Sequence, residues 1–389
     1  MIEHNTPHKV VVIGGGYAGT AAANHLRLRD DVDITLVNSR PKFVERIRLH
    51  QFVAGNDDAS VDYGTLLGEG IELVVDNATR IDTASRTVEL ASGPALDYDY
   101  VIYAVGSTGA VPSAVPGAAE FAHSLAGLES AERLRVRLAE LPADAVVTVV
   151  GGGLTGIETA AELADQGRTV TLVCGRTLAP ALSAPGRRSV ATWLSEHGVT
   201  VLEGTAVTEV RRDAVVFSEG AVRQSALTVW TAGFGVPGLA AASGLRVDAL
   251  GRLLTDETLL SVDDDRIVAA GDAGSPSGQP LRMSCQAAIP LGVQAADAVL
   301  SRIAGTAPAV IDQGFRGVLI SLGRHAGIKQ VVGADDTPLG THFDGREGAQ
   351  MKEEQCRLTV MGLGMEARNP GTIAWYKPGP RLAQVATAR

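Results

Sequence analysis

The sequence has few cysteines, no excess of basic residues and no long apolar run, and each absence excludes a class of function. Its 389 residues include three cysteines, Cys174, Cys285 and Cys356. No two of them lie close enough in sequence for a C-x-x-C redox pair or a zinc knuckle. The net charge of −10 argues against a general nucleic-acid binder, because such proteins carry a basic face. We therefore expect no metal site and no nucleic-acid partner.

We expect neither a targeting segment nor a membrane-spanning segment. Residues 1–5 form neither a basic n-region nor an apolar h-region, so no secretory signal is expected. Uncharged stretches such as residues 100–119 are interrupted by glycine and proline, which excludes a transmembrane helix there. We expect a cytoplasmic protein, long enough for two or three domains that each bury a core.

Glycine, by contrast, is abundant, with 45 residues in the chain, and its spacing carries the first motif. The apolar run at residues 10–13 predicts a parallel strand that is buried on both faces. Gly14, Gly16 and Gly19 follow with G-x-G-x-x-G spacing, which allows a tight turn, close approach of a pyrophosphate, and close packing of the next helix. The free N–H groups where that helix begins would hold phosphates.

The same pattern recurs at residues 146–158, with Gly151, Gly153 and Gly156 in the equivalent places. One copy of this spacing is a weak indication, since a glycine-rich turn occurs in many α/β domains. Two copies make chance a poor explanation. The sequence therefore predicts two dinucleotide sites.

The strand after each glycine loop should end in an acid that binds a ribose diol. The first such strand ends at Asn38, whose amide can still donate to and accept from hydroxyls. The second is followed by Cys174, with Arg176 two residues later. A nearby arginine can bind the 2′-phosphate of NADP, so this loop favours NADPH over NADH. The alternative is a solvated loop in which the arginine has no role.

Residues 41–52 mix cations with apolar residues directly after the first ribose strand. One interpretation is a helix with a solvated charged face. The other places Arg46 or Arg48 near the phosphates of a cofactor and His50 near its ring.

Further along the chain, two buried strands end in short glycine turns, Ala104-Val105-Gly106 and Gly271-Asp272. A helix is expected from residue 284 to about 303, interrupted or started near Pro290, and its positive N-terminal end would suit a ring that becomes anionic on reduction. Beyond residue 308, strands are expected at 317–322 and 328–332.

In this order the motifs resemble the FAD-dependent pyridine nucleotide oxidoreductase superfamily over residues 8–305. Residues 284–292, and the lack of a cysteine pair after Asn38, are most similar to type II NADH dehydrogenases and apoptosis-inducing-factor-like oxidoreductases. The resemblance implies an α/β fold with two Rossmann-like, doubly wound domains, the second inserted in the first. We expect residues 1–115 and 233–307 to bind FAD, residues 116–232 to bind NAD(P)H, and residues 308–389 to form a small α+β region.

The resemblance also implies roles for individual residues. In the superfamily the aspartate at Asp272 binds the ribityl and phosphate region of FAD, and the helix starting near Gln286 faces the flavin ring. Glu158 matches a glutamate near the junction of flavin and nicotinamide, and we hypothesise that Arg46, Arg48 or His50 is its partner. We assign catalytic roles to Glu158 and His50. The residues expected to bind FAD are Gly14, Gly16, Tyr17, Ala18, Gly19, Asn38, Arg46, Ala104, Gly106, Gly271, Asp272, Gln286 and Ala287, and those expected to bind NAD(P)H are Gly151, Gly153, Gly156 and Arg176.

Three functions follow from these expectations. The first is an NAD(P)H dehydrogenase that passes a hydride to flavin and then electrons to a quinone-like or other small acceptor, without a redox-active disulfide. The second is a soluble reductase for a small redox protein, and the third is a redox-sensing module with slow turnover.

For the first, the basic and aromatic tail after Glu366, ending at Arg389, suits peripheral contact with a membrane, although Pro370, Pro378 and Pro380 forbid a long helix there. The sequence is compatible both with a monomer and with a homo-oligomer.

Overall fold

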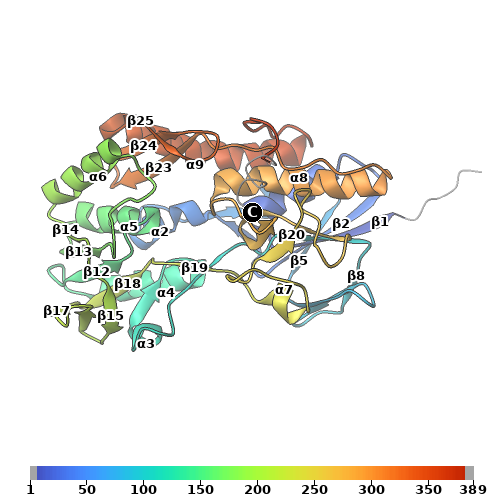
Figure 1. Cartoon of the computed structure of the whole chain (residues 1–389). Coiled ribbons are helices and arrows are strands. Elements are labelled where there is room, and N and C mark those ends of the chain that lie inside the picture. Colours follow the sequence, from blue (N-terminus) through green and yellow to red (C-terminus); the bar gives the residue numbers. More distant parts are fainter. Residues whose placement is uncertain (1–6, 382–389) are drawn as a thin grey trace, which may run out of the picture.

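The computed structural model describes residues 7–381, which form two lobes with a C-terminal layer lying across both (Figure 1). The first lobe is built on a parallel five-stranded sheet of order β21-β9-β1-β2-β5. Its central strand β1 is the predicted apolar run, and residues 10–13 are at most 4% exposed. The strands are β1 (His8–Ile13), β2 (Val32–Asn38), β5 (Ile71–Val75), β9 (Tyr100–Tyr103) and β21 (Ile267–Ala269).

The second lobe repeats this design with the order β11-β18-β12-β13-β14, again all parallel. Strand β12 occupies the place that β1 has in the first sheet, and each is followed by a glycine loop and a helix, α1 (Tyr17–Leu26) or α5 (Leu154–Asp165). The predicted pair of doubly wound α/β units is therefore confirmed. The strands are β11 (Ala122–Ser124), β12 (Val147–Val150), β13 (Val170–Val173), β14 (Thr200–Leu202) and β18 (Leu227–Trp230).

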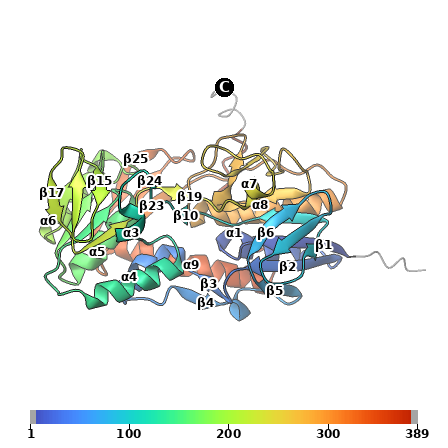
Figure 2. The same ribbon diagram turned by 90° about the horizontal axis from the view of Figure 1, so that it is seen from below.

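A short antiparallel ribbon joins the two lobes (Figure 2). It consists of β10 (Thr108–Gly109) on the way out of the first lobe and β19 (Phe234–Gly235) on the way back. The second lobe is thus inserted between two adjacent strands of the ribbon. The domain limits at 115/116 and 232/233 lie close to it and remain a prediction.

Segment 41–52 is not the single helix that one interpretation expected. It forms a short strand β3 (Lys42–Val44), a 3₁₀ turn η1 (Arg46–Arg48) and a short helix α2 (Leu49–Val53). The remaining elements complete the two lobes. They are β4 (Ser60–Asp62), η2 (Tyr63–Thr65), β6 (Ala78–Asp82), β7 (Thr87–Leu90), β8 (Leu96–Asp97), α3 (Ala118–Phe121), α4 (Leu128–Glu140), α6 (Ala184–Glu196), β15 (Val207–Val210), β16 (Ala214–Phe217), β17 (Val222–Gln224), α7 (Leu239–Ala242), β20 (Leu253–Thr255), η3 (Gly271–Ala273) and β22 (Gly274–Pro276).

Helix α8 (Cys285–Ile303) packs tightly against α1 because both helices present small residues. A Cβ atom built on Gly292 would lie 2.2 Å from the carbonyl oxygen of Ala18. The helix is continuous through Pro290, so the expected interruption there is wrong, and Ser284 caps its start by accepting a hydrogen bond from Ala287 N. The first turn of α8 is thereby held beside the first glycine loop.

The C-terminal layer contains more structure than the sequence indicated. The two expected strands are present as β23 (Gly317–Leu322) and β24 (Ala326–Val332), but β25 (Pro338–Phe343) and the long helix α9 (Gly345–Arg368) were not foreseen. Helix α9 packs on β23 and β24 and reaches α1 of the first lobe.

The end of α9 is fixed by a buried group of charges. Glu366 is fully buried and accepts hydrogen bonds from His25 on α1 and from the backbone of Gly371 and Ile373. Burial lowers the pKa of His25, but its bonds to Asp297 and Glu366 outweigh that effect and raise the pKa to about 9. Helices α1, α8 and α9 and the following tail are thus tied together by an imidazolium.

The close contact between α1 and α8 yields a test of stability. We expect Gly292→Ala to destabilise the fold by about 1–3 kcal/mol, because the new methyl group must push the Ala18 backbone away. Gly362→Ala on α9 is the matched control, since nothing lies within 4 Å of a Cβ there, and it should stabilise by up to about 1 kcal/mol. Denaturant unfolding measures both, and equal effects of the two changes would contradict the packing argument.

Candidate functional site

The two glycine loops have the same construction. Gly14 has φ +102°, and a Cβ on it would lie 2.4 Å from Ala104 O. A Cβ on Gly19 would lie 1.8 Å from Gly14 O, whereas nothing is within 4 Å of a Cβ on Gly16. The first and third glycines are therefore needed for the turn and the helix contact, and the middle one leaves space in front of the backbone.

In the second loop the distances nearly repeat. A Cβ on Gly156 would lie 1.9 Å from Gly151 O, and Gly153 again has open space. Gly16 and Gly153 are the N-caps of α1 and α5, and neither helix start is capped by a side chain. Both loops thus offer free N–H groups and room for an anion, which fits the pyrophosphate of a dinucleotide.

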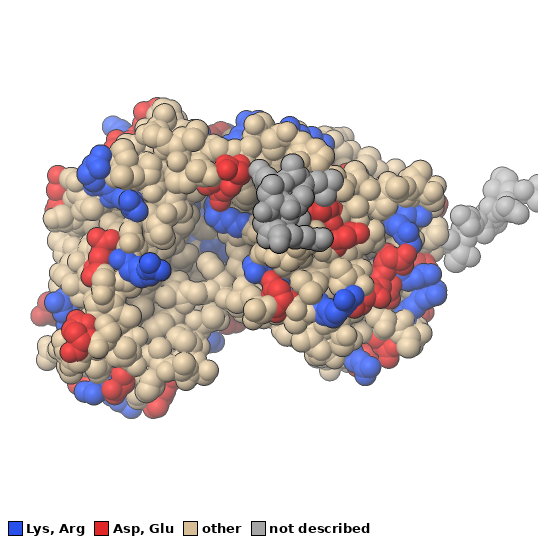
Figure 3. All heavy atoms as spheres, in the orientation of Figure 1, with Lys and Arg blue, Asp and Glu red and all other residues tan. Residues whose placement is uncertain are grey.

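A cavity of about 520 Å³ lies where the first turns of α1, α5 and α8 meet helix α9. Figure 3 shows the molecule hollowed between the two lobes, with acidic and basic side chains interspersed over the face in view. Most of the predicted site residues share this cavity. They are Gly16, Tyr17, Ala18, Arg46, His50, Ala104, Gly106, Gly153, Glu158, Gly271, Asp272 and Gln286.

The other predicted residues do not line the cavity. Gly14, Gly19, Gly151 and Gly156 lie behind the loops that they shape, and Ala287 is buried one residue beyond Gln286.

Asn38 and Arg176 also lie outside this cavity. Asn38 accepts a hydrogen bond from Gly15 N at 3.0 Å and donates one to Arg40 O at 2.8 Å, so its amide braces the first loop. Arg176 is exposed on the loop after β13. Ribose and phosphate contacts by these two residues remain predictions.

Three polar side chains form a chain along one wall. Arg46 donates to Ser107 Oγ at 3.0 Å, and Ser107 donates to Asp272 Oδ2 at 2.7 Å. Burial lowers the pKa of Arg46, although the Asp272 carboxylate opposes the effect. Ser107, which the sequence did not single out, thus links Arg46 to Asp272, and the contacts of these two residues with a cofactor remain predictions.

Glu158 lies at the centre of the most strongly charged part of the cavity. Lys352 Nζ on α9 is 2.7 Å from Glu158 Oε1, and His50 Nδ1 is 3.6 Å from Glu158 Oε2. Ser321 N also donates to this carboxylate at 3.0 Å, and His50 Nε2 lies 2.9 Å from Ser321 Oγ. Residues from four separate segments therefore meet around one buried carboxylate.

The pKa values in this group follow from burial and mutual attraction. Burial lowers the pKa of Lys352, but the Glu158 carboxylate outweighs it and the pKa lies above the usual range. Burial raises the pKa of Glu158, but the Lys352 ammonium and the Ser321 N–H outweigh it and the pKa lies below the usual range. Burial lowers the pKa of His50 to about 4, so its imidazole is neutral at pH 7. The cavity therefore contains an ammonium, a carboxylate and a neutral imidazole within reach of one another.

Of the partners hypothesised for Glu158, His50 is the one that approaches it. The alternative that Arg48 is the partner of Glu158 is wrong, because the Arg48 guanidinium binds Glu353, with Nη2 2.6 Å from Oε1. Arg46 bonds to Ser107 instead. The main partner, Lys352, was missed, because it lies in a polar stretch of a helix that the sequence did not predict.

Two of the three cysteines also line the cavity. Burial raises the pKa of Cys285, and it raises the pKa of Cys356 to about 11. Both side chains are therefore thiols rather than thiolates at neutral pH.

Clusters of metal ligands and membrane-spanning helices are both absent from the described part of the chain. Among residues 7–381, no group of three or more His, Cys, Asp or Glu side chains is arranged to hold a metal ion. Within the same range, no helix combines the length and the apolar character needed to cross a membrane.

The ion pair between Glu158 and Lys352 can be tested by a double-mutant cycle. We expect Glu158→Gln and Lys352→Met to cost about 3–5 kcal/mol each, because each leaves a buried charge without its partner. The double variant should lose less than the sum, by roughly 1–3 kcal/mol. Unfolding free energies give the coupling, and Glu354→Gln, which removes an exposed pair on the same helix, should cost about 0.5 kcal/mol or less. Strict additivity would contradict a direct interaction.

Comparison with known proteins places these features in context. The model of the pyridine nucleotide-disulphide oxidoreductase family matches residues 8–292. An NADH dehydrogenase-like protein from Mycobacterium tuberculosis is 32% identical over 314 residues, covering 73% of this chain and 78% of that protein. A type II NADH:quinone oxidoreductase from Staphylococcus haemolyticus is 26% identical, covering 92% and 96%.

Solved structures agree on the fold. The structure of NDH2 from Plasmodium falciparum in complex with NADH superposes with a TM-score of 0.77 at 15% identity, covering 94% of this chain and 100% of that one. The two glycine loops and the family match lead to the same result. The chain belongs to the pyridine nucleotide-disulphide oxidoreductase family and is an oxidoreductase.

Proposed function

We propose that this protein is an FAD-dependent NAD(P)H dehydrogenase that passes electrons to a quinone-like acceptor. The single observation that carries the proposal is the cavity in which both glycine-loop helices and the Glu158–Lys352 pair converge. The names of the relatives, which refer to NADH and to quinone, support the same reaction class.

The first loop and its neighbours would hold FAD. Gly16 and the start of α1 offer N–H groups to its pyrophosphate, and the chain from Arg46 through Ser107 to Asp272 lines the wall beyond. The start of α8 brings a positive dipole end to the same cavity. Bound there, the flavin would supply the hydride and electron chemistry.

The second loop would hold NAD(P)H, so that the nicotinamide reaches the same cavity past Glu158. Gly153 and the start of α5 form the pyrophosphate cradle, and Glu158 follows one turn later on that helix. A nucleotide lying along α5 is thereby directed toward the flavin position, which is the positioning that hydride transfer requires.

Lys352 and Glu158 suit the acceptor step. The Lys352 ammonium lines the cavity and stays protonated beside Glu158, so it can donate a hydrogen bond to a carbonyl oxygen of the acceptor. The neutral imidazole of His50 is bonded to Ser321, and its Nδ1 lies 3.6 Å from the other oxygen of Glu158. The raised pKa values of Cys285 and Cys356 argue against a dithiol step, so we propose transfer without a redox-active disulfide.

We further propose peripheral contact with a membrane, through α9 rather than the tail. Leu358, Met361 and Met365 form an apolar stripe on the exposed face of α9, each at least 40% exposed. Gln355, one turn before Leu358, lines the cavity, so the stripe lies next to its wall. The described part of the tail, residues 369–381, packs on the protein instead, and Trp375 Nε1 donates to Asp312 there. Arg389 lies outside the described residues.

Anaerobic mixing with NADH or NADPH tests the reaction. We expect loss of visible flavin absorbance, followed by its return when a water-soluble quinone is added. Lys352→Gln should slow the second step by roughly 100-fold, since it removes a positioned proton donor, and should slow the first step much less, through its effect on Glu158 alone.

The same experiment separates the roles of the two residues. Glu158→Gln should slow flavin reduction by the nucleotide, and an unchanged rate would remove Glu158 from the junction. A protein without flavin, or whose flavin neither nucleotide bleaches, would refute the dehydrogenase proposal.

Liposome flotation tests the membrane contact. We expect Met361→Glu combined with Met365→Glu to reduce binding to anionic liposomes by at least about tenfold, because two apolar side chains are replaced by charges. Leu339→Glu is the control, since Leu339 is 46% exposed on β25 and outside the stripe. Equal binding by all three proteins would remove α9 from the membrane surface.

A further inference from the structure

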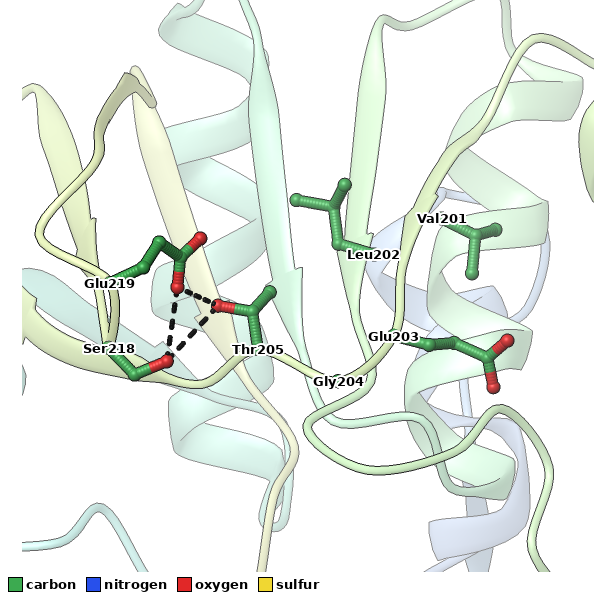
Figure 4. A pocket seen from close by; sticks show the side chains of 7 residues that line it. All are labelled: Val201, Leu202, Glu203, Gly204, Thr205, Ser218 and Glu219. Atoms are coloured by element: carbon green, nitrogen blue, oxygen red, sulfur yellow. Dashed lines mark hydrogen bonds between the residues drawn. The ribbon is translucent and has the colours of Figure 1, made fainter.

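A second hollow of about 690 Å³ lies in the second lobe, away from the central cavity. Figure 4 shows that the side chains around it come from the end of β14 and from the turn after β16. Two of the side chains are carboxylates, and none is a lysine or arginine. The lining residues are Val201, Leu202, Glu203, Gly204, Thr205, Ser218 and Glu219.

Glu203 follows strand β14, next to the position after β13 where a ribose-binding acid was expected and Cys174 is found instead. Strand β14 pairs with β13, and Cys174 N donates to Leu202 O at 2.8 Å. Cys174 therefore follows β13 directly beside Glu203, which follows β14. In a doubly wound nucleotide domain, the residue after the second strand lies beside the adenosine ribose, and here that residue carries no charge.

The carboxylate of Glu203 is held toward this position. Its Oε1 accepts a hydrogen bond from Leu178 N at 2.5 Å, and Leu178 belongs to the loop that follows Cys174. Burial and the Glu203 charge together raise the pKa of Cys174 to about 12, so the charge acts at the Cys174 thiol.

The other carboxylate of the hollow is directed elsewhere. In Figure 4 Glu219 turns to Thr205 and Ser218, while Glu203 points away from them. Thr205 Oγ1 donates to Glu219 Oε2 at 2.6 Å. Glu219 is thus bound within its own turn.

We propose that Glu203 supplies the negative charge absent at Cys174 and thereby selects NADH over NADPH. The inference rests on the proposed binding of NAD(P)H to the second glycine loop. A 2′-phosphate carries nearly two negative charges at neutral pH and is repelled by a fixed carboxylate, whereas the 2′-hydroxyl of NADH is not. Arg176, exposed on the same loop, acts in the opposite direction, and Glu203 is the charge that the protein holds in place.

Dissociation constants of NADH and NADPH for the full-length protein test this assignment. The variants are Glu203→Gln, whose amide oxygen can still accept from Leu178 N, and Glu219→Gln as the matched control. We expect the native protein to bind NADH more tightly. Glu203→Gln should tighten NADPH binding by roughly 3–10-fold at low salt and change NADH binding by less than about twofold, and higher salt should reduce the gain.

The outcomes distinguish this inference from the proposed function. If both nucleotides bind and Glu203→Gln leaves the ratio of their dissociation constants unchanged, the role of Glu203 is overturned while the proposed function stands. The same holds if Glu219→Gln changes that ratio equally. Tighter binding of NADPH than of NADH by the native protein also overturns the role of Glu203, and would support binding of the 2′-phosphate by Arg176. Binding of neither nucleotide refutes the proposed function, and the inference falls with it.

Discussion

The buried ion pair between Glu158 and Lys352 is the interaction on which the arrangement of the site depends. A carboxylate at Glu158, 6% exposed, is costly without a cation, and the cation comes from a helix nearly two hundred residues later. This pair joins α5 of the second lobe to α9, and His50 adds α2, which packs on α4 and α5. The C-terminal layer is therefore part of the cavity wall, and any change that moves α9 also moves the charge that Glu158 needs.

The two glycine loops could be predicted from sequence because their geometry is local. Gly19 contacts Gly14 O and Gly156 contacts Gly151 O, each within six residues, so spacing alone records the constraint. The partner of Glu158 could not be found in this way. Lys352 is followed by Glu353 and Glu354, a pattern typical of a solvated helix face, and its burial follows from how α9 packs on β23 and β24.

Prediction from the sequence is limited in the same way at the ends of the strands that follow the two glycine loops. The ribose contact of Asn38 remains a prediction, and the hydrogen bonds of its amide to Gly15 N and Arg40 O are visible only in the folded loop. Cys174 occupies the equivalent place in the second lobe, where it packs so closely on Gly152 that a Cβ there would lie 2.7 Å from the Cys174 Cβ. One loop is braced by hydrogen bonds and the other by packing, so the same backbone design accepts different side chains at the position that normally reads the ribose.

The insertion of the second lobe also sets the order in which the protein is completed during synthesis. Strands β9 and β21 lie side by side, yet residues 104–266 separate them. The first sheet therefore cannot gain its last strand, β21, until the ribosome has made the whole second lobe. In the second lobe, the outer strand β11 pairs with β18, the last strand of that sheet to be made. The lobe that starts later can close first, while the first glycine loop, made earliest, gains its packing partner α8 only afterwards. A nascent chain halted before α8 would thus carry all five strands of the second sheet beside a first glycine loop that still lacks its packing partner.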